Sequence, residues 1–250
     1  MAKIKLSDIK TQQLNKAVKE KIKAENVTLV NHIGELQHKM CAEGKHSLLI
    51  IIQGMDASGK DGAVRRIFKG ANPNGIVIKS FKKPTEEEFA HDFLWRVHPH
   101  VPKKGMIQIF NRSHYEDILV PSVYGYLPKK NIKDRYDIIN NFEKLIESNG
   151  TTILKFYLHI NKDEQYKRLM ERIEIKEKHW KHNDGDWETR KHWDNFMSVY
   201  EEIFEKCNEP KWHIVPSTKN WEKVNFMAKI IVKAMEDMNL KWPELKSEKF

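Results

Sequence analysis

Apolar and polar residues follow one another along the chain with two different periods, and each period predicts a different kind of element. Up to about residue 45 the pattern is helical, because Leu29, Ile33, Leu36 and Met40 recur at the three-to-four spacing of one helix face. This stripe fits either a core-facing surface or a dimer seam, and the pattern favours the core. At residues 47–53 the sequence becomes SLLIIIQ, a short continuous run typical of a strand buried on both faces.

Four further apolar runs have the same character and are separated by helical or mixed sequence. They lie at residues 76–80, 106–110, 151–158 and 212–216. The intervening helices are indicated by a capping box at residues 85–88, a one-sided apolar face within 129–149 and an amphipathic stretch at 221–238. Five strands interleaved with helices predict an α/β fold in which a five-stranded parallel sheet is covered on both sides.

Residues 162–205 interrupt this alternation. They contain no strand-like run, and between residues 167 and 191 there are eight Lys or Arg and six Asp or Glu. Such a segment is too polar for the core, so we expect a helical lid that projects over the edge of the sheet. The chain shows no internal repeat, low-complexity tract or Gly/Ser linker. A single domain over residues 1–250 is therefore predicted, with an N-terminal helical extension over about 1–45.

Composition narrows the classes of partner. The net charge of +9 attracts polyanions such as nucleic acid, an anionic membrane or phosphate-rich small molecules, although charge alone also serves solubility. No apolar stretch approaches the roughly 20 residues that span a bilayer, and the N-terminus lacks the apolar region of a signal peptide. Cys41 and Cys207 are too far apart to indicate a disulfide framework. We expect a protein of the reducing cytoplasm.

A phosphate-binding loop follows the first predicted strand directly. Residues 54–60 read GMDASGK, which matches the pattern G-x-x-x-x-G-K between a strand and a helix. The glycines allow the backbone to curl so that successive N–H groups point at a phosphate, and the helix adds its positive N-terminal end. Lys60 supplies a mobile charge for the phosphate in transfer. The phosphate-binding residues predicted in this loop are Gly54, Ala57, Ser58, Gly59, Lys60, Asp61 and Gly62.

Two carboxylates make this loop unusual. Asp61 stands where loops that bind nucleoside triphosphates place a Ser or Thr ligand of Mg²⁺. Asp56 lies inside the loop, where a carboxylate repels bound phosphate unless Mg²⁺ bridges the two or the carboxylate manages a proton on an acceptor phosphate. A solvated surface aspartate is the alternative interpretation of Asp56.

A second polar motif, NRSHYED at residues 111–117, ends the third predicted strand. The carboxyl ends of parallel strands are where α/β sheets bind their ligands. Arg112 can there bridge two phosphate oxygens and stabilise the charge on a phosphoryl group in transfer. Glu116 and Asp117 fit either a metal site or the first turn of a helix, where the helix dipole favours acids. The residues that we assign to nucleotide contacts are Asn111, His114, Tyr115, Glu116 and Asp117.

Basic residues exceed what a nucleotide requires. Between residues 60 and 83 there are seven Lys or Arg and one acid, which fits either an anion longer than a nucleotide or a solvated helix face. In the lid, Arg168 and Arg172 are four residues apart and share a helix face, so a cationic lid can close over phosphates and exclude water. Outside the loop, the predicted phosphate-binding residues are Arg65, Arg66, Lys69, Lys82, Lys83, Arg112, Arg168, Lys181 and Arg190.

Together these motifs resemble the type 2 polyphosphate kinase family. The resemblance rests on GMDASGKDG at residues 54–62, FNRSHYED at 110–117 and the lid sequence between Lys178 and Arg190, in this order. It extends from about Gly34 to the C-terminal helix. It implies a thymidylate-kinase-like P-loop kinase core with a helical lid, dependence on Mg²⁺ with Mn²⁺ as a substitute, and phosphoryl transfer from polyphosphate to nucleotides.

Roles for individual residues follow from the resemblance, position by position. Many family members have Asp at the position of Asn111 and Trp at that of His114, and the present variant resembles the subgroup that acts on both nucleoside mono- and diphosphates. Since Asn111 lacks a charge, the metal is expected to bind Asp56, with Asp61 and Glu116 as further candidates. The catalytic residues that the resemblance implies are Asp56, Lys60, Arg112 and Arg172.

The activity predicted from these observations is reversible, Mg²⁺-dependent phosphoryl transfer between inorganic polyphosphate and nucleotides. It converts AMP to ADP and ADP to ATP, with guanine nucleotides as further substrates. One alternative, a nucleoside monophosphate kinase with a nucleoside triphosphate donor, usually has its loop close to the N-terminus, whereas about 50 residues precede the loop here. The other alternative, a non-enzymatic polyanion binder, explains the charge but not Asp56, Lys60 and Arg112. We expect a homo-oligomer, with neither nucleic acid nor a membrane as partner.

Overall fold

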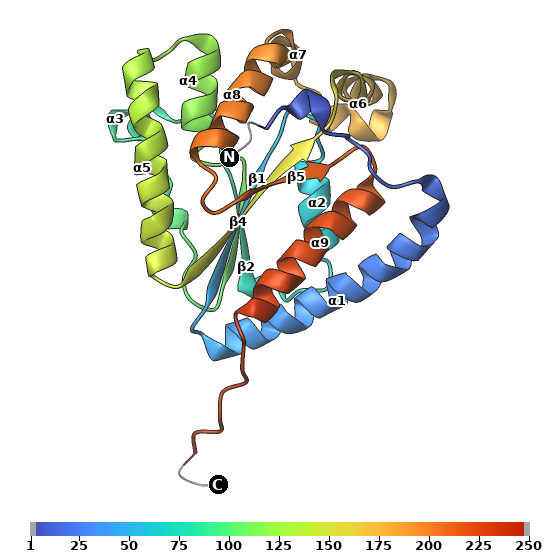
Figure 1. Ribbon diagram of the computed structural model, residues 1–250, viewed down its shortest axis with the longest axis vertical. Coiled ribbons are helices and arrows are strands. Elements are labelled where there is room, and N and C mark those ends of the chain that lie inside the picture. Colours follow the sequence, from blue (N-terminus) through green and yellow to red (C-terminus); the bar gives the residue numbers. More distant parts are fainter. Residues whose placement is uncertain (1–3, 248–250) are drawn as a thin grey trace.

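The computed structural model describes residues 4–247 and places a five-stranded parallel sheet at the centre of the molecule (Figure 1). The strands run in the order β2-β3-β1-β4-β5, and all four pairings are parallel. The predicted α/β fold and its five-stranded sheet are thereby confirmed. The strands are β1 (Ser47–Gln53), β2 (Ile76–Ser80), β3 (Ile107–Asn111), β4 (Thr151–His159) and β5 (Trp212–Pro216).

The register of the central strands brings the two polar motifs together. Ile52 of β1 pairs with Asn111 of β3, so the loop after β1 and the motif that begins at Asn111 leave the sheet side by side. Every residue of β1 is buried, as its apolar run predicts. The edge strand β2 differs, because Val77 and Ile78 are 45% and 54% exposed. The prediction that the sheet is covered on both sides is therefore wrong at β2.

One face of the sheet is covered by α1 (Lys19–Glu43), α9 (Asn220–Asp237) and α2 (Lys60–Ile67) (Figure 1). Ile33 and Met40 of α1 are fully buried in a cluster that includes Met227 of α9. The apolar stripe of α1 therefore belongs to the core, and the dimer-seam interpretation of it is wrong. Packing at this face explains why a helix as polar as α1 is stable next to the sheet.

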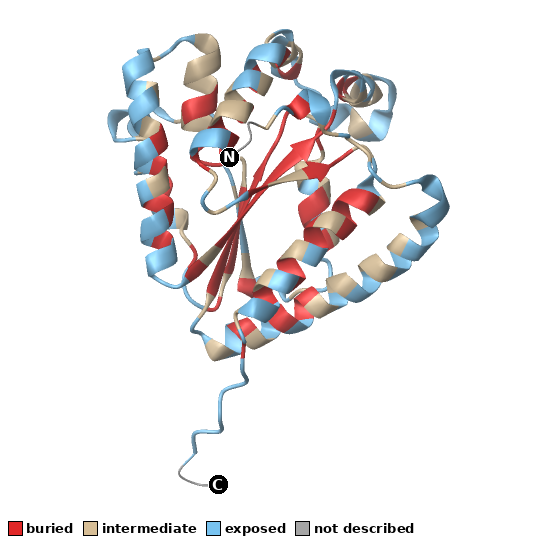
Figure 2. Ribbon diagram, viewed as in Figure 1, coloured by how far each residue is buried: buried red, intermediate tan, exposed pale blue. Residues whose placement is uncertain are grey.

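The other face is covered by α4 (Glu116–Tyr124), α5 (Lys129–Ser148) and α8 (Trp193–Lys206), while the short α3 (Glu86–Ala90) lies in the connection between β2 and β3. Phe142 of α5 and Phe204 of α8 pack with Trp212 of β5 in a second apolar cluster. Buried residues follow the sides of the helices that face the sheet, and exposed residues follow the outer sides (Figure 2). This is the arrangement that one apolar face per helix dictates.

The chain before α1 is mostly not helical. Residues 4–18 contain only two 3₁₀ turns, η1 (Leu6–Asp8) and η2 (Lys16–Val18). Other backbone donors of this segment bond to distant carboxylates: the Leu6 N–H donates to Glu201 at 2.8 Å and the Leu14 N–H to Glu222 at 2.8 Å. The prediction of helix from residue 1 is thus wrong over residues 4–18, and residues 1–3 lie outside the described part.

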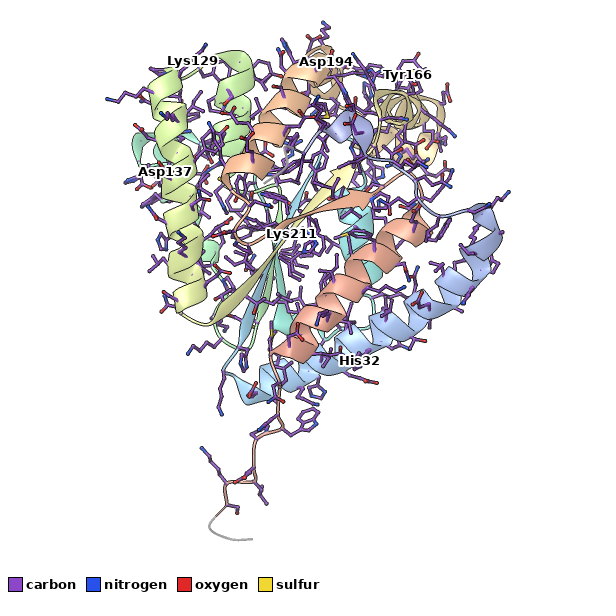
Figure 3. The ribbon with its side chains drawn as sticks, viewed as in Figure 1. His32, Lys129, Asp137, Tyr166, Asp194 and Lys211 are labelled. Atoms are coloured by element: carbon purple, nitrogen blue, oxygen red, sulfur yellow. The ribbon has the colours of Figure 1, made fainter. Side chains whose placement is uncertain are left out.

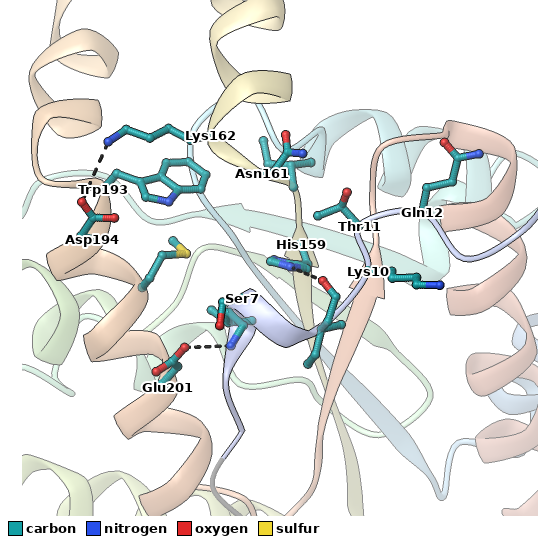
Figure 4. A pocket seen from close by; sticks show the side chains of 14 residues that line it. Ser7, Lys10, Thr11, Gln12, His159, Asn161, Lys162, Trp193, Asp194 and Glu201 are labelled. Carbon is teal, nitrogen blue, oxygen red and sulfur yellow. Dashed lines mark hydrogen bonds and ion pairs between the residues drawn. The ribbon is translucent and has the colours of Figure 1, made fainter.

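This N-terminal segment closes one part of the sheet's carboxyl edge. A cavity of about 540 Å³ lies between the segment, the end of β4 and the start of α8 (Figure 4). Beside it, His159 Nε2 donates to the Ile9 carbonyl at 3.1 Å, and the Thr218 N–H after β5 donates to the Thr11 carbonyl at 3.1 Å. None of the predicted site residues lines this cavity. The loops after β1 and β3 are therefore the part of the edge that carries the predicted chemistry.

The predicted lid is shorter than residues 162–205. It consists of α6 (Lys162–Glu174), the 3₁₀ turn η5 (Lys176–Lys181) and α7 (Asp184–Lys191). Tyr166 of α6, labelled in Figure 3, packs edge-to-face on Trp187 of α7 with ring centroids 5.8 Å apart. By contrast, α8 is a core helix, because Phe196, Tyr200 and Ile203 recur at helical spacing and are buried. The sequence interpretation missed this face because it considered the overall charge of residues 162–205, which the polar residues before α8 dominate.

Candidate active site

The phosphate-binding loop folds as its glycines predict. Gly54, Ala57 and Gly59 have φ of 144°, 61° and 93°, a region that side chains with a Cβ rarely adopt. At Gly54 there is also no room, since a Cβ there would lie 2.9 Å from the Leu158 carbonyl oxygen. These conformations let the chain turn from β1 into α2, whose first residue is Lys60.

Lys60 is folded back onto this loop. Its Nζ donates to the carbonyl oxygens of Gly54 at 2.7 Å and Met55 at 3.2 Å. Burial lowers the pKa of the ammonium, and the nearby Arg112 guanidinium lowers it further. The charge is therefore incompletely compensated within the protein, which makes Lys60 a strong donor for a phosphate oxygen.

Asp56 and Arg112 form an ion pair across the two motifs. Arg112 Nη2 donates to Asp56 Oδ1, and the two side chains are 38% and 13% exposed. The Glu116 carboxylate is the main cause that raises the pKa of the Arg112 guanidinium, while burial opposes it. The structure thus brings together three of the four predicted catalytic residues, Asp56, Lys60 and Arg112.

The three predicted metal ligands do not form a ready-made metal centre. The described residues contain no group of three His, Cys, Asp or Glu side chains that could hold a metal ion. Asp61 instead accepts a hydrogen bond from the Asn111 amide, and burial raises the pKa of Glu116. An Asp in place of Asn111 would confront Asp61 with a second carboxylate, so the amide relieves a repulsion that the sequence alone did not reveal.

His114 and Tyr115 belong to the core and not to a nucleotide site. Both side chains are fully buried. His114 Nε2 lies 3.1 Å from Glu143 Oε1, and the Tyr115 hydroxyl donates to the same oxygen at 2.9 Å. Lys155 Nζ donates to Glu143 Oε2 at 2.7 Å and completes the network. The assignment of His114 and Tyr115 to nucleotide contacts is therefore wrong, because both side chains are buried in the core.

Asp117 is likewise occupied by a structural partner. Arg96 Nη2 donates to Asp117 Oδ2 at 2.9 Å, and the Asp117 side chain is 12% exposed. Burial raises the pKa of Asp117, and Arg96 opposes the rise. The assignment of Asp117 to nucleotide binding stays a prediction, although its carboxylate has a partner within the protein. Of this predicted group, Asn111 and Glu116 lie next to the phosphate loop.

Arg168 holds the loop from outside instead of offering its charge to a substrate. Its Nε donates to Glu164 at 2.7 Å. Its Nη1 donates to the carbonyl oxygens of Ala57 at 3.0 Å and Ser58 at 3.1 Å, and its Nη2 to those of Ser217 at 2.8 Å and Thr218 at 3.0 Å. A guanidinium has five N–H donors, and all five are used. In this arrangement Arg168 has no N–H group left for a phosphate, and its predicted role in phosphate binding stays a prediction.

The remaining lid arginines connect α6 with α7. Arg172 Nη1 donates to Asp186 and to the Lys181 carbonyl oxygen at 3.0 Å. Burial raises the pKa of Asp186, and the Asp56 carboxylate of the loop raises it further. Arg190 Nη1 donates to the Lys162 carbonyl at 2.6 Å and is turned toward α6. The catalytic role of Arg172 stays a prediction.

Most of the other predicted cations are exposed around the loop. Arg66 differs, because its Nη1 donates to the Gly62 carbonyl at 2.8 Å and burial lowers its pKa, with Arg65 as the second cause. Lys181 lies 4.9 Å from the ring of Trp180, which is itself 79% exposed. Among the predicted phosphate-binding residues, the exposed cations that form no ion pair within the described residues are Arg65, Lys69, Lys82, Lys83 and Lys181.

Comparison with known proteins agrees with this geometry. The sequence model of the polyphosphate kinase 2 family matches residues 16–243. The chain belongs to the polyphosphate kinase 2 family. An AMP/ADP-polyphosphate phosphotransferase of Meiothermus ruber is 44% identical over 218 residues, which cover 86% of this chain and 82% of that protein. An ADP-polyphosphate phosphotransferase of Rhodopseudomonas palustris is 37% identical over 231 residues, or 87% of this chain and 80% of that protein.

A crystal structure of a polyphosphate kinase 2 from Arthrobacter aurescens has the same fold. It superposes with a TM-score of 0.94 at 37% identity and covers 98% of this chain and 89% of that chain. The match therefore extends over nearly the whole of the present polyphosphate kinase 2 family member. No helix among residues 4–247 is long and apolar enough to cross a membrane.

One residue near the loop was missed altogether by sequence reasoning. Lys223 of α9 is fully buried, and its Nζ lies 3.2 Å from the Gly59 carbonyl oxygen. In the sequence it is one lysine among several in an amphipathic helix, so nothing distinguishes it from a solvated side chain. Only the packing of α9 against the loop reveals the position of Lys223. The family resemblance rests on motifs that do not include this residue.

Proposed function

We propose that the chain transfers phosphoryl groups between inorganic polyphosphate and nucleoside mono- and diphosphates, converting AMP to ADP and ADP to ATP. The observation that carries the proposal is the cluster of Asp56, Lys60 and Arg112 at the carboxyl edge of the sheet, next to cations without carboxylate partners. The printed activities of the two relatives, polyphosphate with AMP or ADP, support the choice of substrates.

Electrostatics explains why such a site suits two phosphate-bearing substrates. Two like unit charges 4 Å apart repel by about 4 kcal/mol at an effective dielectric of 20, and a nucleotide tail opposite a polymer multiplies this repulsion. Lys60 and Arg112 are held by a pair of carbonyls and by Asp56, respectively. Charged phosphate oxygens are stronger acceptors than carbonyls, so substrate binding can draw these cations from their internal partners and hold the reacting oxygens in line.

The transfer itself requires little from the protein beyond this alignment. A terminal phosphate oxygen of AMP or ADP is already largely ionised near pH 7, so no general base is needed to activate it. That oxygen forms a bond to the terminal phosphorus of polyphosphate while the bridging P–O bond breaks, and the polymer leaves one unit shorter. Arg112 stabilises the charge that develops on the phosphoryl group, and the lid pair Arg172–Asp186 faces the same space.

The donor set fits Mg²⁺ as phosphotransferases use it. Mg²⁺ is commonly held by one or two carboxylates and completed by substrate phosphates and water, which agrees with the lack of a three-ligand cage among residues 4–247. Asp56 and Asp61 both act electrostatically on Lys60, so both carboxylates border the loop. When bound there, the ion would supply positive charge to the phosphate oxygens.

The experiment that tests this function supplies acceptor and donor together. Purified protein is incubated with polyphosphate, Mg²⁺ and either AMP or ADP, and nucleotides are separated by chromatography. We expect ADP from AMP and ATP from ADP, and loss of both products when Mg²⁺ is chelated. The absence of any new nucleotide with active-site residues intact would contradict the proposal.

Several finer points remain proposals of the same kind. We propose that guanine nucleotides are also accepted, that the protein works in the cytoplasm and that copies of the chain associate. The two cysteines are unpaired, with Cys41 exposed and Cys207 buried, as suits a reducing compartment. The exposed apolar residues Val77 and Ile78 on the edge strand β2 are candidates for a contact between copies.

A further inference from the structure

Lys223 is a buried cation in an unusual environment. The residue lies on α9 directly under the phosphate-binding loop and is fully buried. Its Nζ lies 3.4 Å from the Ser58 carbonyl oxygen and 3.2 Å from the Gly59 carbonyl oxygen. It forms no ion pair with a carboxylate within the described residues. A buried ammonium without an anion is costly, so its retention calls for a physical reason.

The loop carbonyls do not need Lys223 as a hydrogen-bond donor. The Ser58 carbonyl already accepts from Arg168 Nη1 at 3.1 Å, and the Gly59 carbonyl accepts from the Ala63 N–H at 3.0 Å. Removing the lysine would therefore leave neither oxygen unsatisfied. The contacts of Lys223 are second bonds to acceptors that are already used, which argues against a purely structural role.

The charged groups around Lys223 all have the same sign. Arg168 of α6 and Arg66 and Lys60 of α2 act on it electrostatically, and together with burial they lower its pKa to about 7, burial being the largest cause. Acids on the elements packed around Lys223 have other partners, and Glu164 of α6 pairs with Arg168 at 2.7 Å. The adjacent Glu222 binds the N–H groups of the N-terminal segment, and Glu25 of α1 pairs with Lys229. Among residues 4–247, no carboxylate forms an ion pair with Lys223.

Gly59 lets the ammonium approach this closely. A Cβ on Gly59 would lie 2.5 Å from Lys223 Nζ, which no real side chain permits. The carbonyls of Ser58 and Gly59 belong to the same peptide groups as the N–H donors of Gly59 and Lys60. A cation on the oxygen side of a peptide group strengthens its N–H as a donor on the opposite side. Lys223 is thus placed to polarise the loop toward a bound phosphate.

We propose that Lys223 is a positioning residue for the phosphate loop, whose buried charge is completed by the phosphates of a bound polyanion. This proposal depends on one part of the function proposed above, namely that the loop binds condensed phosphate. Binding then raises the pKa of Lys223, so the protein takes up a proton when the ligand binds above the free value of about 7. Affinity for polyphosphate falls as the pH rises through that range.

The test compares Lys223→Met with wild type and with Lys233→Met. Lys233 lies on the same helix, is 77% exposed and pairs with Asp237, so its loss is a matched control. Binding of tripolyphosphate is measured by calorimetry at about pH 6 and about pH 9, in two buffers with different ionisation enthalpies. We expect Lys223→Met to weaken binding about tenfold at the lower pH, the difference to shrink at the higher pH, and proton uptake to disappear.

Stability and turnover separate this role from a structural one. Replacing an unpaired buried ammonium by an apolar side chain of similar length is expected to leave the melting temperature unchanged or raised. The Michaelis constant for polyphosphate should rise while the turnover number changes by less than about threefold. Equal tripolyphosphate affinity of Lys223→Met and wild type at both pH values would overturn the proposal.

Two further outcomes are informative without that variant. If Lys223→Met does not fold, proton uptake by wild type between about pH 7 and 9 decides, because the proposal requires it and its absence contradicts it. If wild type binds no tripolyphosphate at all, the proposed function fails first. If wild type binds with no dependence on Lys223, only the inference about this residue fails.

Discussion

Arg112 has a strained backbone conformation that positions its charged side chain at the phosphate-binding loop. Its φ of 60° is unfavourable for a side chain with a Cβ, and such strain costs on the order of 1–3 kcal/mol. The conformation is held by the bond from its N–H to the Ile52 carbonyl at 3.0 Å. It places the guanidinium against Asp56 at the mouth of the loop. Such strain is typical of residues whose side chain must be held in a particular position to contact a substrate.

Removing either cation of this cluster should stop turnover without unfolding the protein. We predict that Lys60→Ala and Arg112→Ala each lower the turnover number by on the order of 10³, because each removes charge that stabilises the phosphoryl group in transfer. Arg112→Lys should recover only part of this loss, since a point charge cannot bridge two oxygens. Steady-state kinetics with melting curves checks this, with the exposed Lys144→Ala as control. Near-wild-type turnover in both variants would contradict these roles.

The buried network around Glu143 is expected to govern stability instead of turnover. Burial raises the pKa of Glu143, but the hydrogen bond with His114 and the Lys155 ammonium together hold it below its ordinary value of 4.5. A depressed folded pKa contributes stability that is present above the unfolded pKa and is lost as the pH falls through the folded one.

Glu143→Gln tests that network through pH. It should lower the free energy of unfolding by about 3–5 kcal/mol at neutral pH, because Lys155 is left as a buried charge without its carboxylate. Below the ordinary pKa of 4.5 the variant should lose stability less steeply with acid than wild type. Urea titrations at several pH values measure both effects. If the free energy of unfolding falls equally steeply with acid in both proteins, Glu143 does not contribute to the pH dependence of stability.

At the scale of elements, the sequence predicted which helices and strands exist better than where each of them begins and ends. Strand β1 and the loop after it were found correctly, because one apolar run and one glycine pattern determine them locally. The extent of the lid was predicted incorrectly. The apolar face of α8 lies within a charged segment, and only tertiary packing distinguishes α8 from α7. His114 and Tyr115 failed for the same reason: a polar side chain in a motif faces inward when a partner such as Glu143 lies there.

The lid that remains, from α6 to α7, should contribute to polyphosphate binding through its exposed cations. We predict that Lys181→Ala raises the Michaelis constant for polyphosphate several-fold and leaves the melting temperature unchanged, because Lys181 is exposed beside Trp180. Lys191, 66% exposed and paired with Glu188 on the same lid, provides the control for a general loss of charge. An equal effect of Lys181→Ala and Lys191→Ala would show that position within the lid does not matter.

At the scale of the whole molecule, the chain carries a net charge of +9. Exposed cations of α2 and of the chain after β2 have no carboxylate partners within the described residues, and the N-terminal segment closes the edge beyond β4 and β5. Composition alone predicted a polyanion as partner but not its place. The parallel topology supplied the place, because it brings the loops after β1 and β3 to one edge.

Salt should therefore weaken the enzyme's use of polyphosphate. Raising ionic strength from about 0.05 M to about 0.2 M shortens the screening length, so the Michaelis constant for polyphosphate should rise several-fold. Replacing Lys82 and Lys83 together by Gln should flatten this dependence, since both are exposed. Initial rates at varied salt test this. An unchanged salt dependence in the double variant would place the polymer elsewhere on the surface.

The most direct measurement concerns the identity of the donor. Initial rates of ATP formation from ADP and Mg²⁺ are compared with polyphosphate, with GTP and with no donor, for wild type and Lys60→Ala. The account predicts rapid ATP formation with polyphosphate that Lys60→Ala abolishes, and no comparable rate with GTP. ATP formation that polyphosphate does not accelerate, together with efficient transfer from GTP, would contradict it.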